Sequence, residues 1–198
     1  MSKTIVVAHQ KGGVGKSTLA LNLAYRFSQE MKIALTDTDP QGTLIRLKNI
    51  ASGLNIMTHD EAKKNNKKYD VILVDTPPYL SEKIPTIFSE ADFVLIPTKA
   101  GVPDVMAIDA TIKLFKEAQK NNNKLLGGII LNMVKPRTSL TFFAKEQLYA
   151  YNIPILGQIG DRVAFNNTFL SGGIFTSEDS QAKQEIELLA TEILNVLK

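Results

Sequence analysis

The sequence predicts an α/β protein with a mostly parallel, twisted sheet and helices on both faces. Short β-rich runs alternate with longer stretches of helical periodicity, which is typical of successive strand-helix units. The runs at 71–74 and 93–96 are entirely apolar, as expected of strands that are buried on both faces. A glycine-rich segment between the first expected strand and the first expected helix indicates a loop that holds phosphate.

The periodicity places each element along the chain. Strands are expected at 3–8, 32–36, 70–75, 92–97, 126–132 and 153–156, and helices at 16–30, 104–120, 140–151 and 180–197. Residues 52–69 carry Lys63, Lys64, Lys67 and Lys68, and they favour a solvated helix and loop over a contact with DNA. A chain of 198 residues suits one domain that spans 1–198.

Composition excludes several classes of protein. Cysteine is absent, so disulfides and thiolate metal sites are excluded. The net charge of +3 comes from 23 basic and 20 acidic side chains, an excess too small to indicate nucleic acid by itself. The apolar run at 5–8 is too short for a secretory signal, and no run approaches the ~20 residues of a membrane span. We therefore expect a cytoplasmic protein.

Residues 11–18 read Lys-Gly-Gly-Val-Gly-Lys-Ser-Thr, a phosphate-binding loop with an additional lysine at its first position. Its glycines allow backbone N–H groups to surround a phosphate, and the following helix adds a favourable dipole. The second lysine can reach the β- and γ-phosphates, while the serine hydroxyl can ligate Mg²⁺. The predicted nucleotide contacts are Lys11, Gly12, Gly13, Val14, Gly15, Lys16, Ser17 and Thr18.

Aspartates follow two of the expected strands. Asp37 and Asp39 come at the end of the second strand, and Asp75 closes the apolar run at 71–74. Ligands of open α/β sheets bind at the carboxyl ends of the strands, so these carboxylates should lie beside the phosphate loop. An aspartate after an apolar run, as in a Walker B segment, would hold Mg²⁺ directly or through water.

Together these motifs resemble those of the ParA/MinD ATPases. The resemblance rests on 11–18, on Asp-Thr-Asp-Pro-Gln-Gly at 37–42 and on Asp-Thr-Pro-Pro at 75–78, and the Asp-Pro-Gln detail favours the ParA side. It extends over nearly the whole chain, through 93–98, 128–132 and a helix expected near residue 163. The chain begins two residues before its first expected strand, so a short ParA type without an N-terminal helix-turn-helix is expected.

The resemblance implies an ATPase that forms an ATP-dependent homodimer with nucleotides sandwiched between the subunits. Lys11 would reach the partner's phosphates, Lys16 would bind its own subunit's phosphates, and Asp39 would activate water. The implied Mg²⁺ residues are Ser17, Asp37 and Asp75. An asparagine at the position of Asn132 contacts adenine in similar proteins.

The same resemblance implies non-specific binding to the DNA of the nucleoid, plasmid or chromosome partition, and a ParB-like adaptor that stimulates slow hydrolysis. Relatives often carry a basic residue early in the helix near 163, where this chain has Val163-Ala164-Phe165. The candidate DNA contacts are therefore Arg162, Lys135, Arg137, Lys113, Lys116, Lys120 and Lys124.

Three alternatives remain beside this reading. The first is a positioning ATPase for another cargo, such as a protein organelle or receptor cluster, whose motifs would be the same. The second is a membrane-bound MinD type, which is disfavoured because glutamates flank the apolar stripe Ile186, Leu189, Ile193 and Leu197. The third is an ATP-dependent metabolic ligase, which would need a separate substrate pocket and would leave Lys11 without a role.

Overall fold

Seven parallel strands form one sheet in the order β3-β2-β4-β1-β5-β6-β7. The computed structural model describes residues 2–38, 42–48, 51, 53–79, 82–135 and 139–198. The strands are β1 (Lys3–Val7), β2 (Ile33–Asp37), β3 (Ile56–Thr58), β4 (Val71–Asp75), β5 (Phe93–Thr98), β6 (Leu126–Val134) and β7 (Ile155–Gly160). The expected parallel sheet is confirmed, and β1 lies at its centre.

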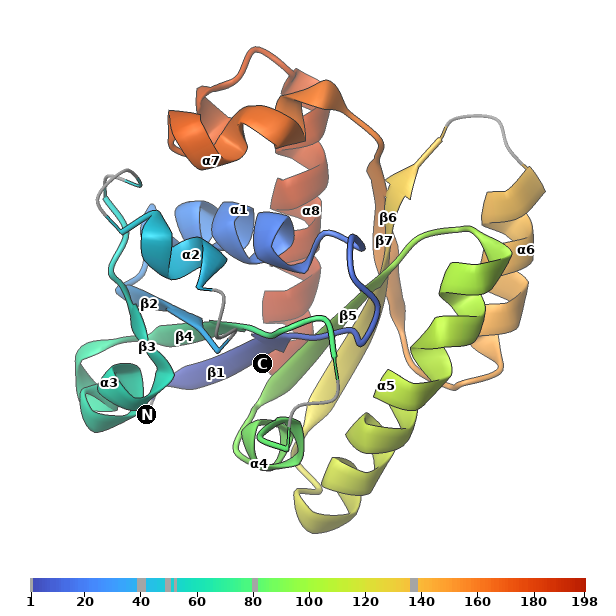
Figure 1. Cartoon of the computed structure of the whole chain (residues 1–198), viewed down its shortest axis with the longest axis horizontal. Helices are drawn as coiled ribbons and strands as arrows, with labels where there is room; N and C mark the ends of the chain where they lie inside the picture. Colours follow the sequence, from blue (N-terminus) through green and yellow to red (C-terminus); the bar gives the residue numbers. More distant parts are fainter. Residues whose placement is uncertain (1, 39–41, 49–50, 52, 80–81, 136–138) are drawn as a thin grey trace.

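Helices cover both faces of this sheet (Figure 1). One face packs against α1 (Lys16–Ser28), α2 (Thr43–Arg46) and α8 (Ser180–Leu197). The other packs against α3 (His59–Lys64), α4 (Ile84–Ser89), α5 (Val102–Asn121) and α6 (Ser139–Tyr149). Shorter turns are α7 (Thr168–Ser171) and the 3₁₀ segments Asn66–Lys68, Val163–Asn167 and Ile174–Thr176.

The six expected strands and four expected helices are all present, with ends shifted by a few residues. The sequence missed β3, which has three residues, and α2, α4 and α7, which have four to six, whereas α3 lies in the segment 52–69 for which a solvated helix and loop were expected. Elements this short complete at most one or two periods, so their pattern cannot be told from a loop. The helix expected near 163 begins as a 3₁₀ segment and becomes regular only at α7.

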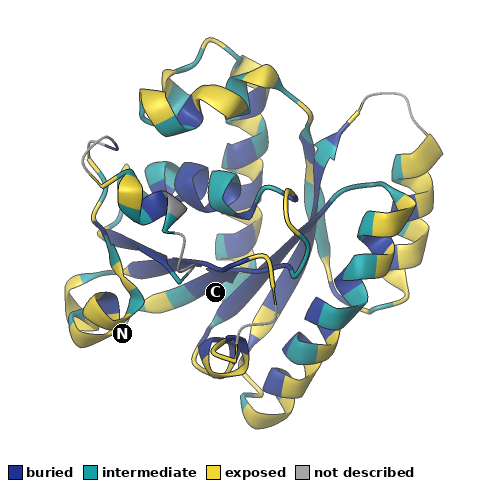
Figure 2. Cartoon of the chain, in the orientation of Figure 1, coloured by how far each residue is buried: buried dark blue, intermediate teal, exposed yellow. Residues whose placement is uncertain are grey.

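The central strands are buried on both faces, which explains their apolar runs (Figure 2). Along β1, Ile5 joins the core formed with α1 and α8, whereas Val6 joins the core formed with α4 and α5. The same alternation places Leu73 and Val74 of β4 in opposite cores. Because successive strand side chains point to opposite faces, each apolar run supplies both cores at once.

The apolar stripe of α8 belongs to the first of these cores. Ile186, Leu189 and Ile193 are buried there against the sheet and α1. This confirms the expectation that the stripe packs in the core. No helix in the described part of the chain is both long enough and apolar enough to cross a bilayer.

Adjacent leucines of α8 provide a test of this packing. Replacing Leu189, which is 1% exposed, with alanine should lower the free energy of unfolding by about 2–5 kcal/mol, because it leaves a cavity in the core. Leu188→Ala is the matched control, since that side chain is 57% exposed and should change stability by less than about 0.5 kcal/mol. Urea unfolding monitored by circular dichroism would measure both, and equal losses would contradict the assignment.

Candidate functional site

The carboxyl edge of three neighbouring strands assembles the acidic part of the site. β4 lies between β1 and β2, and its Asp75 pairs in register with Val7 on one side and Asp37 on the other. Both carboxylates therefore emerge beside the loop that follows β1, as the sequence predicted. Thr38 continues from β2 and donates from its N–H and its hydroxyl to the Asp75 carbonyl, at 3.0 and 2.8 Å.

The phosphate-binding loop ends where α1 begins. Gly15 precedes the helix with φ +91°, a left-handed conformation that favours glycine. Lys16, the first helical residue, is 6% exposed, and its Nζ donates to the Lys11 carbonyl at 3.2 Å. A cavity of about 310 Å³ lies over the loop, lined by Gly12, Gly13, Gly15, Lys16, Ser17, Thr18, Thr76, Pro78 and Met133. The loop backbone, the helix N-terminus and the Lys16 ammonium make this cavity suitable for an anion.

Ser17 and Asp75 meet beside this cavity. The Ser17 hydroxyl donates to Asp75 Oδ2 at 2.5 Å, while Asp75 Oδ1 is buried and has no hydrogen-bond partner among the described residues. Burial raises the pKa of Asp75 to about 7, with the Asp37 charge adding to the effect and the Ser17 hydrogen bond and Lys16 opposing it. A buried carboxylate oxygen without a partner, next to a hydroxyl, suits Mg²⁺ that also binds phosphate oxygens.

Asp37 is placed somewhat differently. Its Oδ2 accepts the N–H of Leu44 at 2.8 Å, at the start of α2, and the residue is 7% exposed. It thus joins the end of β2 to the start of α2, and it lies near enough to Asp75 to raise the pKa of that carboxyl. Asp39 lies outside the described residues, so its predicted role as the residue that activates water stays a prediction.

An irregular end of β6 directs Asn132 at the loop. The pairing of β6 with β7 shifts register between Leu131 and Val134, and Met133 has φ +53°, which is uncommon for a residue other than glycine. Asn132 is 4% exposed, and its Nδ2 donates to the Val14 carbonyl at 2.8 Å. The structure therefore assigns it a contact with the loop backbone, while the adenine contact stays a prediction.

A second cavity adjoins the first at Thr18 and Met133. It has a volume of about 180 Å³ and is lined further by Leu19, Asn132, Ile159, Gly160, Asp161, Arg162, Phe165, Asn166 and Phe169. Its aromatic side chains and backbone groups make it suitable for a base and sugar next to the phosphate site. The sequence did not single out Phe165 and Phe169, because they come from 3₁₀ and one-turn segments without a recognisable motif.

Lys11 is held within its own chain by three contacts. Its N–H donates to His9 Nδ1 at 2.8 Å, its carbonyl accepts from Lys16, and its Nζ pairs with Asp104 Oδ1 at 2.7 Å. The sequence did not single out His9 or Asp104, which come close to Lys11 only through the fold. His9 is 2% exposed, and burial lowers its pKa to about 4, with Lys16 and Lys11 acting in the same direction and Asp104 against them.

The structure separates the candidate DNA contacts into three groups. Arg162 is held by Glu185 at 2.8 Å and lies 3.8 Å from Asp179, so its guanidinium supports α8 and is poorly available to DNA. Four lysines are exposed on α5 or just after it: Lys113, Lys116, Lys120 and Lys124. Lys135 is exposed at the end of β6, and Arg137 lies outside the described residues.

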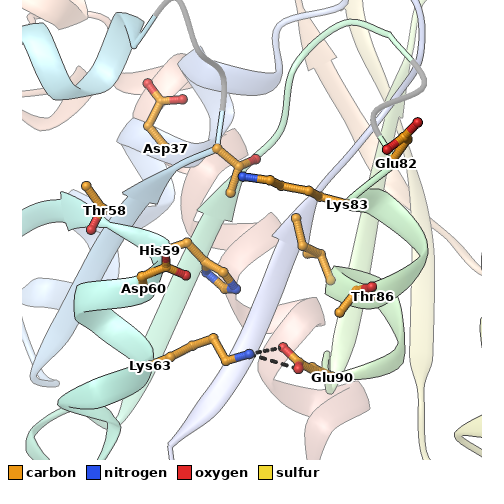
Figure 3. A pocket seen from close by; sticks show the side chains of 11 residues that line it. Asp37, Thr58, His59, Asp60, Lys63, Glu82, Lys83, Thr86 and Glu90 are labelled. Atoms are coloured by element: carbon orange, nitrogen blue, oxygen red, sulfur yellow. Dashed lines mark hydrogen bonds and ion pairs between the residues drawn. The ribbon is translucent and has the colours of Figure 1, made fainter.

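A larger cavity, about 570 Å³, lies between α3 and α4 (Figure 3). His59 points into it, with both ring nitrogens buried and without a partner among the described residues, and Lys63 donates to Glu90 across it. The cavity borders Asp37, but neither the loop glycines nor Lys16 line it. The cavity of about 310 Å³ over the loop is therefore the candidate phosphate site, although the larger cavity offers more space.

The fold and the site define a P-loop nucleoside triphosphatase: a parallel sheet, a glycine loop before α1, and a buried aspartate facing the loop serine. The model of the CobQ/CobB/MinD/ParA nucleotide binding domain matches residues 5–173. The chain belongs to this family. It is an ATPase, and its nucleotide is ATP with Mg²⁺.

Individual relatives agree with this assignment. The chain is 28% identical over 207 residues to the maintenance of carboxysome distribution protein A of Halothiobacillus neapolitanus, covering 96% of each chain. It is 27% identical to a ParA protein of Rhizobium radiobacter, covering 89% of this chain and 86% of the relative.

Solved structures show the same fold. Apo McdA from Cyanothece superimposes with a TM-score of 0.80 at 18% identity, covering 98% of this chain and 100% of that one. A putative plasmid partition protein from Borrelia burgdorferi, bound to AMPPNP, gives a TM-score of 0.76 at 23% identity, covering 98% and 99% of the two chains.

Two loop glycines provide a matched test of the close approach of Asn132. A Cβ at Gly15 would lie 2.2 Å from Asn132 Nδ2, whereas a Cβ at Gly13 would have nothing within 4 Å. Both have positive φ, so each alanine should cost about 1–2 kcal/mol of backbone strain. Only Gly15→Ala should also displace Asn132. It should therefore weaken the binding of a fluorescent ATP analogue much more than Gly13→Ala does. Equal loss of affinity in both variants would contradict this contact.

The buried His9 predicts an acid dependence of stability. Its pKa is about 4 in the folded chain and 6.5 in the unfolded chain, so the unfolded chain binds the proton first as the pH falls. Wild type should therefore lose about 3 kcal/mol of unfolding free energy between pH 6.5 and 4 that His9→Asn does not lose. Asparagine keeps an acceptor for the Lys11 N–H. Urea unfolding across this pH range would measure the difference, and parallel curves for the two proteins would contradict it.

Proposed function

We propose that this chain is a ParA-type positioning ATPase that forms a sandwich homodimer with ATP and binds DNA non-specifically on the nucleoid. In this proposal residues 1–198 act as one ATPase domain in the cytoplasm. A ParB-like adaptor on the cargo stimulates hydrolysis and releases the dimer from DNA. One observation supports the proposal most directly: Lys11 lies in the phosphate-binding loop of a MinD/ParA family chain, and its side chain is 37% exposed. An exposed ammonium group at this position can reach a partner subunit.

In each subunit, different residues bind the phosphates, hold the metal and orient the attacking water. The loop N–H groups and Lys16 bind the β- and γ-phosphates, while Ser17 and Asp75 hold Mg²⁺, with Asp37 supporting that shell. Asp39 orients the water that attacks the γ-phosphorus. The bond from that phosphorus to the bridging oxygen breaks, and ADP and inorganic phosphate are the products. Mg²⁺ held by Ser17 and Asp75 would supply positive charge beside the phosphate oxygens.

Lys11 links hydrolysis to association. A cation supplied by the partner neutralises the triphosphate only after the two subunits meet, as an arginine finger does. Hydrolysis should be slow without the adaptor, because the catalytic site of one subunit is incomplete until a partner contributes to it. We assign base binding to the cavity beside Thr18, which Asn132 and Phe165 help to line.

DNA binding is assigned to exposed lysines. Lys113, Lys116, Lys120 and Lys124 follow the solvent side of α5 and the turn after it, although Lys113 pairs with Asp109 and Lys120 with Glu117. Such exposed pairs are weak and exchange readily for phosphate contacts. Binding through a few lysines should be independent of sequence and should fall steeply with salt.

Two cargoes have support. Partition of a plasmid or chromosome is favoured by the Asp-Pro-Gln motif and by relatives named ParA and Soj. Positioning of a protein organelle is favoured by near-complete coverage of a carboxysome distribution protein at 28% identity. A metabolic ATP-dependent ligase is a weaker candidate, because it would need to turn over a small acceptor and would give Lys11 no partner to reach.

The DNA step is tested with Asp39→Ala, which should bind ATP but not hydrolyse it. Its affinity for a random duplex is measured with no nucleotide, ADP or ATP, over a series of salt concentrations. We expect binding only with ATP, because only the dimer presents two sets of lysines. Each phosphate contact should contribute about 0.9 to the slope of log affinity against log salt.

Size-exclusion light scattering on the same samples shows whether ATP produces the dimer. If ATP produces a dimer that does not bind DNA, the proposal of a positioning ATPase stands and the proposed DNA binding is overturned. A monomer in every nucleotide state would overturn the sandwich mechanism. Turnover stimulated by a small acceptor, and not by DNA or an adaptor, would favour the metabolic enzyme.

A further inference from the structure

The side chain that is proposed to reach the partner subunit is already paired in the free chain. Lys11 Nζ lies 2.7 Å from Asp104 Oδ1, and the two side chains are 37% and 14% exposed. Asp104 belongs to the first turn of α5, which follows β5 at the same edge of the sheet as the phosphate loop. One ammonium group therefore has two possible anionic partners: Asp104 of its own chain and phosphate across the dimer.

Asp104 is held in place independently of Lys11. Its N–H donates to the Gly101 carbonyl at 2.9 Å, in the first turn of a helix of 20 residues. The N-terminal end of a helix favours a carboxylate through the helix dipole, so the position of Asp104 does not depend on the lysine. A Cβ at position 101 would lie 2.8 Å from Asp104 Oδ2, so the glycine there leaves room for the carboxylate.

α5 also holds the backbone that carries Lys11. The Gln10 N–H donates to Thr111 Oγ1 at 3.2 Å, two turns further along the same helix. The Lys11 N–H is held by His9 and the Lys11 carbonyl by Lys16, so the backbone around the lysine is fixed. The long, flexible side chain is the part of Lys11 that can exchange partners.

We propose that Asp104 is a positioning residue that holds Lys11 in the free subunit, so that dimerisation must break the Lys11–Asp104 pair. This inference rests on the proposed role of Lys11 in the partner's site. A triphosphate carries several negative charges and competes well with one carboxylate, whereas ADP lacks the γ-phosphate and competes less. The pair therefore raises the free-energy threshold for association, which ATP overcomes more easily than ADP because it carries the γ-phosphate.

The decisive variant is Asp104→Asn, which preserves size and removes the charge. Dimer dissociation constants are measured by analytical ultracentrifugation with Mg²⁺ and a non-hydrolysable ATP analogue, and again with ADP. Releasing one partly exposed ion pair should tighten the dimer by roughly 5-fold, and the two pairs of a dimer by roughly 25-fold. Association with ADP should tighten by no more than the same factor, because the free subunit holds the same pair with either nucleotide.

Three controls separate this role from a structural one. Asp109→Asn removes the carboxylate paired with Lys113 on the same helix, at 2.7 Å, and should leave the dimer constant unchanged. Asp104→Glu keeps the charge and should restore most of the wild-type constant. In a Lys11→Ala background Asp104→Asn should have no further effect, because the two substitutions act through one interaction.

The outcomes also distinguish this inference from the proposed function. If wild type dimerises with the ATP analogue and Asp104→Asn gives the same constant, the inference is overturned and the function stands. If Asp104→Asn weakens the dimer, Asp104 presents Lys11 to the partner and the inference is also overturned. If wild type remains monomeric with the ATP analogue, the sandwich mechanism fails and this inference fails with it.

Discussion

The in-register parallel pairing of β1, β4 and β2 is the constraint on which the site depends. It sets Val7, Asp75 and Asp37 side by side, so that the loop after β1 meets two carboxylates at one edge of the sheet. Burial on both faces specifies this register, because a slip of one residue would exchange the side chains of the two cores. The same strands that stabilise the fold therefore determine the spacing of the phosphate site.

Burial also sets the electrostatics of that site. Oδ1 of Asp75 has no hydrogen-bond partner in the part of the chain that the structure describes, and burial raises the pKa of this carboxyl to about 7. Such a group is costly in the free chain and becomes favourable when a divalent cation is bound. Lys16 is likewise buried, with its Nζ bonded to the Lys11 carbonyl. Nucleotide binding would exchange these internal contacts for contacts with phosphate and metal.

The helix α5 contacts the phosphate loop at its first turn and exposes lysines to solvent further along. Its buried side contributes Ile108 and Phe115 to the core, its first turn carries Asp104, and its solvent side carries exposed lysines. One helix therefore carries both the residue proposed to hold Lys11 in the free subunit and the lysines proposed to bind DNA. The cargo is not specified by these features, since relatives with the same fold are named for plasmids and for carboxysomes.

The sequence by itself determined the parallel sheet, its six longer strands and four longer helices, and the loop at 11–18, because these depend on local periodicity and a contiguous motif. The sequence also predicted that Asp37 and Asp75 lie beside that loop, but only the tertiary structure decided its other distant contacts. Asp104 reaches Lys11 across more than 90 positions, and Asn132 reaches Val14 across a separation of 118. It also decided that Arg162 pairs with Glu185, because helix α8 packs beside β7. Local patterns record the face on which a residue lies, whereas its neighbours depend on how all the elements pack.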